Sequence, residues 1–313
     1  NSTSCLYKSL SLFNELEDSI WIVSANQSLS SSYFNMGKQD SAILFCTKAI
    51  KAYQNWNDLK KLASCYNTLG GILWSKGDLP AAAEVFYKSL DLKVKLGDSI
   101  GIANTYNNIG ILFDSQQKFP EALEMYNKSL EIYKKKSIKR GIGRAYNNIA
   151  IVLKNLNRCT EAIEMFQKSL EIDKQLTNID DQGKTLNNIG LLYLQINDAK
   201  SSLIYFNNAK NVFQKNKNLN GEAATILNIG RANLLLGNMA SALSYYNQGL
   251  LLAHEIHSVE LINESYEQLY KAHKKSGNTG LALHYHELNS NLSDSLRSLE
   301  NLNKLDELKI KYE

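Results

Sequence analysis

A pattern of residues recurs every 40 positions along this chain without an insertion or a deletion. Tyr66-Asn67-Thr68-Leu69-Gly70 becomes Tyr106-Asn107-Asn108-Ile109-Gly110, and the next copy is Tyr146-Asn147-Asn148-Ile149-Ala150. A fixed period of this size is typical of stacked units, each of which buries its apolar face only against its neighbours. The period therefore predicts one elongated array, and it favours binding over catalysis.

Two amphipathic helices are expected in each unit. On the first, Tyr106, Ile109 and Gly110 follow a spacing that places them on one face. On the second, a small residue precedes an aromatic residue by four positions, as in Ala122 and Tyr126. Glycine inside a helix costs about 1 kcal/mol relative to alanine, so its repeated use implies close packing. The glycines concerned are Gly70, Gly110, Gly190 and Gly230.

Helix ends are marked at constant positions in the repeat. Glycine or asparagine, which tolerate the left-handed conformation that ends helices, stands between the two helices, and Gln117 is the exception. A capping residue precedes each first helix, and Ile138 breaks that series. The turn residues are Gly37, Gly77, Asn157, Asn197, Gly237 and Gly277, and the caps are Asp18, Asp58, Asp98, Asn178, Asn218 and Ser258.

These features resemble the tetratricopeptide repeat, in its small-x-x-x-aromatic pairing, its aromatic-x-x-Leu-Gly core and its turn glycine. The usual unit has 34 residues, and the present one is six residues longer. The resemblance covers essentially the whole chain. It implies an all-α fold, a right-handed α-solenoid of antiparallel helix pairs with 40-residue repeats and a concave binding surface.

The domain boundaries follow from the phase of the repeat. Because residues 7–10 (Tyr-Lys-Ser-Leu) match residues 87–90, we expect the chain to begin inside the second helix of a truncated upstream repeat, at residues 1–19. Residues 20–297 are expected to hold seven repeats, and residues 298–313 a C-terminal helix that leads out of the domain. Both ends are then cuts through a longer protein.

The tail carries a second resemblance. Leucines at 292, 296, 299, 302, 305 and 308 are separated by charged and amide residues, and the segment ends in Lys309-Ile310-Lys311-Tyr312-Glu313. It is similar to the segment that follows the repeats in membrane sensor proteins of Bacteroidetes-type bacteria. That resemblance implies a periplasmic region connected through a helix and the membrane to a histidine kinase or a DNA-binding regulator. A plain solubilising end helix is the alternative.

A row of asparagines on the first helices is the main candidate for a partner-binding groove. Side-chain amides donate and accept at once, so such a row can bind the backbone of an extended peptide. Apolar residues run beside the row. The alternative is that the amides bond neighbouring helices and that the apolar stripe belongs partly to the core. The predicted groove residues are Asn67, Asn107, Asn108, Asn147, Asn148, Asn187, Asn188, Asn228, Trp74, Ile111, Ile151, Leu191 and Leu194.

All five histidines lie toward the end of the chain, from His254 onward. By repeat position, His273 and His286 should face each other inside the final unit, where a metal or a proton could bind. Polar substitution in a terminal repeat explains the pattern equally well. We therefore predict no metal site and no cofactor. The sequence also contains no phosphate-binding glycine loop or nucleophile motif, so no catalytic residue is proposed.

Composition limits the partners. A formal charge of +4 on 313 residues gives no basis for nucleic-acid binding, and no apolar run reaches the roughly 20 residues that span a bilayer. We expect a protein or peptide ligand, no membrane contact by this segment, and self-association only through the truncated ends or the tail helix. The leading function is the sensory or regulatory part of a membrane-anchored, two-component-type signalling protein in the periplasm. The alternatives are a cytoplasmic adaptor that assembles protein partners and a peptide-responsive intracellular regulator.

Overall fold

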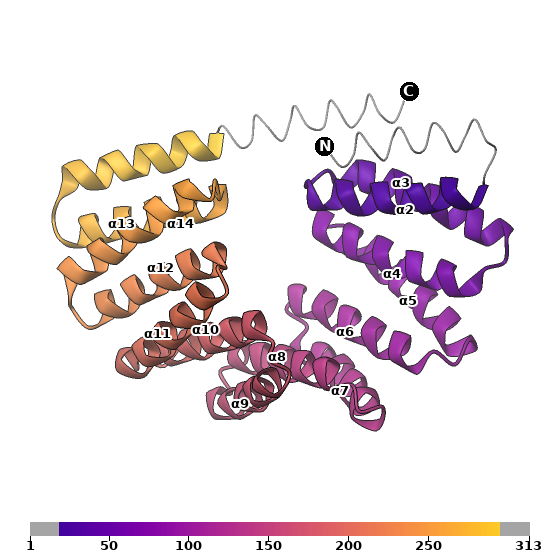
Figure 1. The fold of residues 1–313 in the computed structure, drawn as a ribbon. Coiled ribbons are helices and arrows are strands. Elements are labelled where there is room, and N and C mark those ends of the chain that lie inside the picture. Colours follow the sequence, from indigo (N-terminus) through magenta and orange to yellow (C-terminus); the bar gives the residue numbers. More distant parts are fainter. Residues whose placement is uncertain (1–18, 295–313) are drawn as a thin grey trace. The chain divides into compact units, whose positions relative to one another are not determined.

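The computed structural model describes residues 19–294, which are helical apart from short turns (Figure 1). Within that range the helices follow one another directly and no strand interrupts them. None of these helices combines the length and the apolar character needed to cross a bilayer. The truncated upstream helix expected at residues 1–19 lies outside the described residues except for Ser19, and the C-terminal helix expected at residues 298–313 lies outside them entirely.

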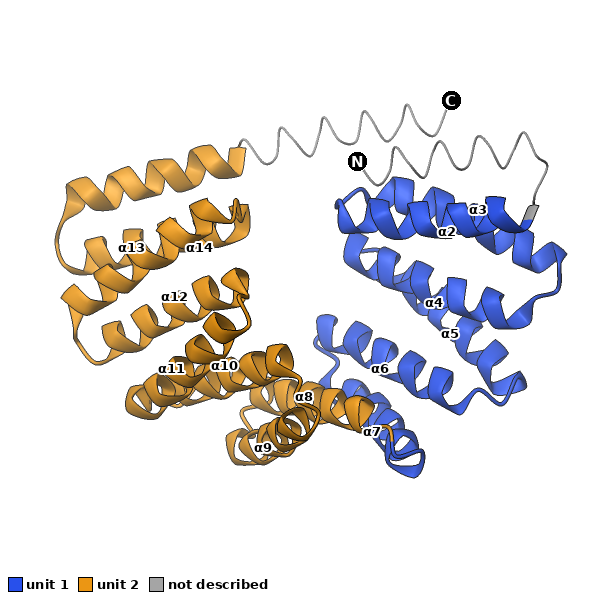
Figure 2. Cartoon of the chain, viewed as in Figure 1, with its two compact units in different colours: residues 1–137, 300–313 blue, residues 138–299 orange. Residues whose placement is uncertain are grey.

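The chain divides into two compact units, one up to Ser137 and one from Ile138 onward (Figure 2). The helices of unit 1 are α2 (Ser19–Asn35), α3 (Gln39–Asn55), α4 (Leu59–Lys76), α5 (Leu79–Lys95), α6 (Ser99–Ser115) and α7 (Phe119–Lys135). Those of unit 2 are α8 (Lys139–Asn155), α9 (Cys159–Gln175), α10 (Ile179–Gln195), α11 (Ala199–Lys215), α12 (Leu219–Leu235), α13 (Met239–Glu255) and α14 (Val259–Lys275), followed by helical residues 279–294.

Consecutive helices pack as antiparallel pairs, which confirms the all-α fold expected from the sequence. The closest packing joins a first helix to the second helix that follows it, as in α4 with α5 and α10 with α11. Within each unit, first helices of successive pairs also contact one another, as α4 does α6 and α12 does α14, whereas second helices approach each other less closely. Each unit therefore curves toward its first helices. We call the solvent-facing side of these first helices the first-helix surface.

One type of turn ends every helix whose bounds are given above. Its central residue has a positive φ and recurs at half the repeat length, both inside a pair and between pairs. The next amide closes the turn, as where Asp78 N–H donates to the carbonyl of Leu73 over 3.0 Å. Gln117 adopts the same conformation at φ 58°, so the exception in the sequence is not an exception in the structure. Thr177 does so at φ 51° although its side chain is β-branched.

Side-chain caps begin only some of the helices. Asp58 and Asp98 accept from backbone amides three residues onward, and Asn218 and Ser258 do the same. Asn178 makes no such bond, so the prediction of a cap there was wrong; its amide nitrogen donates to the Asp181 carboxylate. The second helices α5 and α11 also have caps, Asp78 and Asp198, which the sequence analysis missed.

The reused helix glycines have the packing role predicted for them. A Cβ on Gly110 would stand 2.6 Å from the ring of Tyr126, and one on Gly190 would stand 2.5 Å from the ring of Phe206. Real Cβ atoms do not approach so closely, so the absent side chain lets the paired helix place its aromatic ring against the first helix. These rings are almost fully buried and form the centre of each pair.

Candidate functional site

The predicted asparagines lie on the first helices, and most are half-buried rather than exposed. In unit 1, Asn67 is on α4, and Asn107 and Asn108 are on α6, where Asn107 is buried. In unit 2, half-buried asparagines occupy α8 and α10, and one buried asparagine occupies α12. These are Asn147, Asn148, Asn187, Asn188 and Asn228.

Amide bonds join successive first helices in unit 1. The Nδ2 of Asn108 donates to the Oδ1 of Asn67 over 3.1 Å. The hydroxyl of Thr105 approaches the same oxygen at 3.4 Å. The acceptor side of the Asn67 amide is therefore occupied by the next helix pair.

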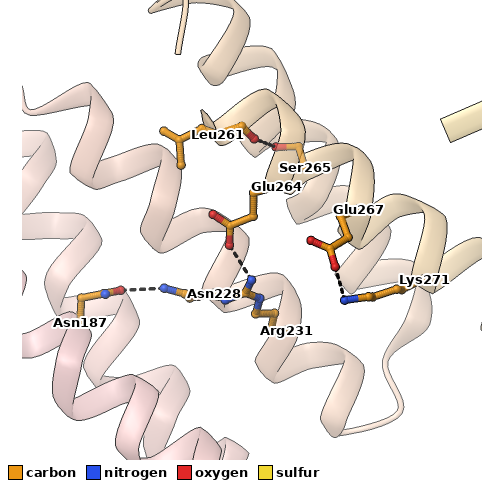
Figure 3. Close-up of polar contacts among 8 residues, drawn as sticks. All are labelled: Asn187, Asn228, Arg231, Leu261, Glu264, Ser265, Glu267 and Lys271. Carbon is orange, nitrogen blue, oxygen red and sulfur yellow. Dashed lines mark hydrogen bonds and ion pairs between the residues drawn. The ribbon is translucent and has the colours of Figure 1, made fainter. Parts of the chain in front are cut away.

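Unit 2 repeats this arrangement. Asn188 Nδ2 donates to Asn147 Oδ1 over 3.3 Å, and Asn228 Nδ2 donates to Asn187 Oδ1 over 3.0 Å (Figure 3). Thr225 Oγ1 again lies 3.4 Å from the accepting oxygen. In both units the bond direction is constant, because the asparagine one residue earlier in the repeat accepts from the asparagine of the following pair.

These bonds show that the asparagine row joins helices, as the alternative interpretation held. They do not use the whole amide. Within the described part of the chain, no hydrogen bond engages Nδ2 of Asn67, Asn147 or Asn187. Each of these groups has two N–H donors left over on a half-buried surface.

The apolar residues beside the row differ in exposure. In unit 1, Trp74 is exposed and its indole N–H donates to Ser115 Oγ over 3.0 Å, while Ile111 is half-buried. In unit 2, Ile151, Leu191 and Leu194 are half-buried. Leu191 and Leu194 pack against a cluster that includes Phe206, so the stripe belongs partly to the core.

Arg231 stands on α12 at the repeat position that Ile151 and Leu191 occupy on α8 and α10. Its guanidinium donates to Asn228 Oδ1 over 3.0 Å and to Glu264 Oε1 over 2.5 Å, and it links α12 to α14 (Figure 3). Both charged side chains are 32% exposed. On α12, a positively charged side chain held by two hydrogen bonds therefore takes the place of an apolar residue of the stripe.

A hollow of about 290 Å³ lies beside Arg231. We call it the α12 hollow. It is lined by Leu194, Asn197, Arg231, Leu234, Leu235, Tyr246, Gln268 and Lys275. Among these, only Leu194 belongs to the groove residues predicted from the sequence. The signal in the sequence that could have revealed this hollow is a loss of periodicity. Leu227 stands where earlier repeats have an asparagine, and Gln268 stands at the repeat position of Asn188 and Asn228.

A smaller cavity of about 60 Å³ lies at Asp173 on α9, bounded by residues of α8, α9 and α10. The pKa of the Asp173 carboxyl is raised to about 6, mainly by burial and also by the nearby charge of Asp181, although a hydrogen bond from Thr185 lowers it. Arg144 and Lys184 line the same cavity. This volume suits a few water molecules.

The histidines do not pair as predicted. His273 stacks on Tyr285 with ring centroids 5.6 Å apart, and His286 lies against Tyr270 at 5.2 Å. Burial lowers the pKa of His273. Among the described residues, no group of three or more histidine, cysteine or acidic side chains is arranged to hold a metal ion.

Family models of the tetratricopeptide repeat match residues 61–135, 141–215 and 181–253, and a further one matches residues 23–55. These matches cover more than half of the chain. The chain belongs to the tetratricopeptide repeat family. Tetratricopeptide repeats are typically non-catalytic protein-interaction domains, and their stacking produces extended binding surfaces.

Solved structures agree on the tetratricopeptide fold. A signal transduction ATPase with a tetratricopeptide repeat sensor from Pyrococcus horikoshii matches with a TM-score of 0.70 and 16% identity, over 95% of this chain and 46% of that one. A Rap protein complexed with competence and sporulation factor matches with a TM-score of 0.59 and 14% identity, over 95% of this chain and 99% of that one. BtubC from P. vanneervenii matches with a TM-score of 0.60 and 18% identity, over 69% of this chain and 91% of that one. A search of curated proteins finds no match.

Proposed function

We propose that the first-helix surface binds an extended peptide segment of a partner protein, with the unused asparagine donors bonding peptide carbonyl groups. The observation that carries this proposal is the one-sided use of the amides. Oδ1 of Asn67 and of Asn187 accepts from the next helix pair, whereas the N–H donors of the same groups have no acceptor among the described residues. A half-buried donor row with free capacity suits main-chain recognition.

The half-buried aliphatic residues beside the row support the same proposal. Ile151, Leu191 and Leu194 keep part of their surface accessible while the rest packs in the core. Such residues are held in fixed positions by their neighbours, so they can contact ligand side chains without a large loss of conformational freedom.

The experiment removes the donors and keeps the acceptors. Asn67→Asp and Asn187→Asp retain Oδ1 for the next helix pair and lose the N–H groups. The probe is a pool of randomised, N-acetylated and C-amidated hexapeptides, and the retained amount is measured by mass spectrometry on immobilised protein. We expect several-fold lower retention with an unchanged melting temperature.

The matched control carries the same charge change on second helices. Asn127→Asp and Asn208→Asp alter exposed amides of α7 and α11, and retention should stay at the wild-type level. Equal loss in both double variants would indicate a general charge effect, and no loss in either would refute the surface assignment.

We further propose that this domain is the sensory or regulatory part of a membrane-anchored signalling protein with a periplasmic location. Its support is the resemblance of the tail, together with the tetratricopeptide sensor named in the similar Pyrococcus horikoshii protein. Sequencing the gene beyond Glu313 tests this. An apolar stretch of about 20 residues followed by a kinase or regulator module is expected, whereas a stop codon or a continuation without such a stretch would favour a cytoplasmic adaptor.

A further inference from the structure

The α12 hollow has an excess of hydrogen-bond donors and positive charge. Arg231 and Lys275 line it, and no acidic residue does. Glu264 takes one N–H group of Arg231, and three of the five guanidinium donors are left after the bonds to Glu264 and Asn228. No carboxylate of the described residues pairs with Lys275.

Tyr246 supplies an independent observation. Its side chain is fully buried at 0% exposure and lines the hollow. Its hydroxyl has no hydrogen-bond partner among the described residues. A buried polar group without a partner costs roughly 1–3 kcal/mol, so a ligand that supplies an acceptor recovers this free energy.

In unit 1 an acidic residue stands near the equivalent tyrosine. Tyr126 on α7 holds the same repeat position as Tyr246, and the Asp114 carboxylate of α6 lies near enough to raise the pKa of Tyr126 beyond the effect of burial. The position of Asp114 is occupied in α12 by Leu234. The chain therefore places a carboxylate beside one of these tyrosines and leaves an apolar side chain beside the other.

We propose that the α12 hollow binds an acidic side chain, glutamate or aspartate, of a peptide lying on the first-helix surface of unit 2. The Tyr246 hydroxyl donates to the carboxylate, and Arg231 and Lys275 neutralise its charge. Leu194, Leu234 and Leu235 contact the apolar neighbours of the acidic residue. The volume is close to the lower limit of about 300 Å³ for ligand pockets, which suits one side chain.

This assignment rests on the proposed function, because it takes the ligand to be a peptide on that surface. The test uses two matched pools of randomised, N-acetylated and C-amidated hexapeptides, one with glutamate fixed at the fourth position and one with glutamine. Hydrogen bonds to charged groups are worth about 1.5–3 kcal/mol. We therefore expect about tenfold greater retention of the glutamate pool by the whole chain.

Two substitutions locate the preference. Tyr246→Phe removes only the hydroxyl, and the fold should tolerate it since Phe86, Phe166 and Phe206 fill the same place in other pairs. Lys275→Gln removes an exposed charge. Each should lower the ratio of glutamate to glutamine retention at least threefold. Tyr126→Phe and Lys95→Gln, which make the same changes in unit 1, should leave the ratio unchanged.

The outcomes separate this assignment from the proposed function. Equal retention of the two pools, or a ratio insensitive to Tyr246→Phe and Lys275→Gln, overturns the acidic-residue site. If the glutamine pool is also retained and the Asn67→Asp/Asn187→Asp variant loses it, the surface assignment survives alone. A glutamate preference that depends on Tyr246 but not on the asparagines would support the hollow and refute the donor row.

A further arm identifies the source of the carboxylate. Glutamine peptides with a free C-terminus carry a main-chain carboxylate and no acidic side chain at the fixed position. If they are retained as well as the amidated glutamate pool, and Tyr246→Phe abolishes this, the hollow binds a chain end and the side-chain assignment is wrong.

Discussion

Lys93 and Asp173 hold the same position in their helix pairs, two repeats apart, and each is buried against a threonine hydroxyl. Lys93 Nζ donates to Thr105 Oγ1 over 2.8 Å, and Thr185 Oγ1 donates to Asp173 Oδ2 over 3.2 Å. Other pairs place Tyr53, Tyr133 or Phe213 there. At a position where other pairs have an aromatic residue, these two pairs thus bury a charged one, positive in one case and negative in the other. Both charges should change how the free energy of unfolding depends on pH.

Asp173 should make the protein more stable in mild acid. Its folded-state pKa of about 6 exceeds the unfolded value of about 3.9, so the folded state binds more protons between these values. The free energy of unfolding should then fall as the pH rises through about 6. One pKa unit corresponds to about 1.4 kcal/mol, so Asp173→Asn should be more stable at pH 7 by up to roughly 3 kcal/mol.

Urea unfolding of wild type and Asp173→Asn at pH 4, 5, 6 and 7 checks this prediction. The difference between the two proteins isolates the contribution of Asp173, because Arg144, Lys184 and Asp181 are present in both. A difference that does not change with pH would contradict a raised pKa.

Lys93 should act in the opposite direction. Burial lowers its pKa, although the Asp98 charge opposes the effect. The folded state then binds fewer protons than the unfolded state between the two pKa values, and stability rises with pH in that alkaline range. Lys93→Met should stabilise the protein by about 1 kcal/mol at pH 7, and the gain should shrink as the pH approaches 10. Thermal unfolding at pH 7 and pH 10 tests both parts.

Two helix glycines should respond to alanine in opposite ways. Gly190→Ala places a Cβ 2.5 Å from the Phe206 ring, and overpacking of this kind costs about 1–3 kcal/mol. Gly71 has open space around its Cβ position, so Gly71→Ala should stabilise α4 by up to about 1 kcal/mol. Differential scanning calorimetry compares them. Adding Phe206→Leu to Gly190→Ala should recover part of the loss, and no recovery would place the strain elsewhere.

Thr177 should be a local source of strain. A β-branched residue at φ 51° is disfavoured in the left-handed region, where glycine is not. Thr177→Gly should therefore stabilise the protein by about 1 kcal/mol, as measured by the urea midpoint. Asn157→Gly, at the equivalent conformation with a tolerant residue, should change it much less. Equal gains would show that the β-branched side chain of Thr177 is not the source of the strain.

Strict periodicity made the fold predictable from sequence. Because the close contact between Gly110 and Tyr126 recurs in every pair that has the glycine, the core could be read from residue spacing alone. The turns were predicted where glycine or asparagine marks them. Gln117 and Lys217 adopt the same turn conformation although neither residue favours it, because the surrounding helices impose it.

The candidate site was predictable only in position. The asparagine row stands where the spacing placed it, yet spacing does not reveal that Asn67 accepts and Asn108 donates, which decides what remains for a ligand. The α12 hollow was missed because its chemistry comes from departures from the repeat. Arg231 replaces an aliphatic residue and Gln268 replaces an asparagine, and a search for recurring residues passes over both.

The identical turn at every helix end has a consequence for how such a chain can change length. Helices begin at one constant interval, which is half of the repeat, so losing one helix with its turn leaves the spacing intact. The loss of a single helix would nevertheless exchange the roles of first and second helices from that point on. The asparagines downstream would then lie on the opposite face of the helix stack. Only duplications or deletions of two helices at a time preserve one continuous row of asparagines on the first helices.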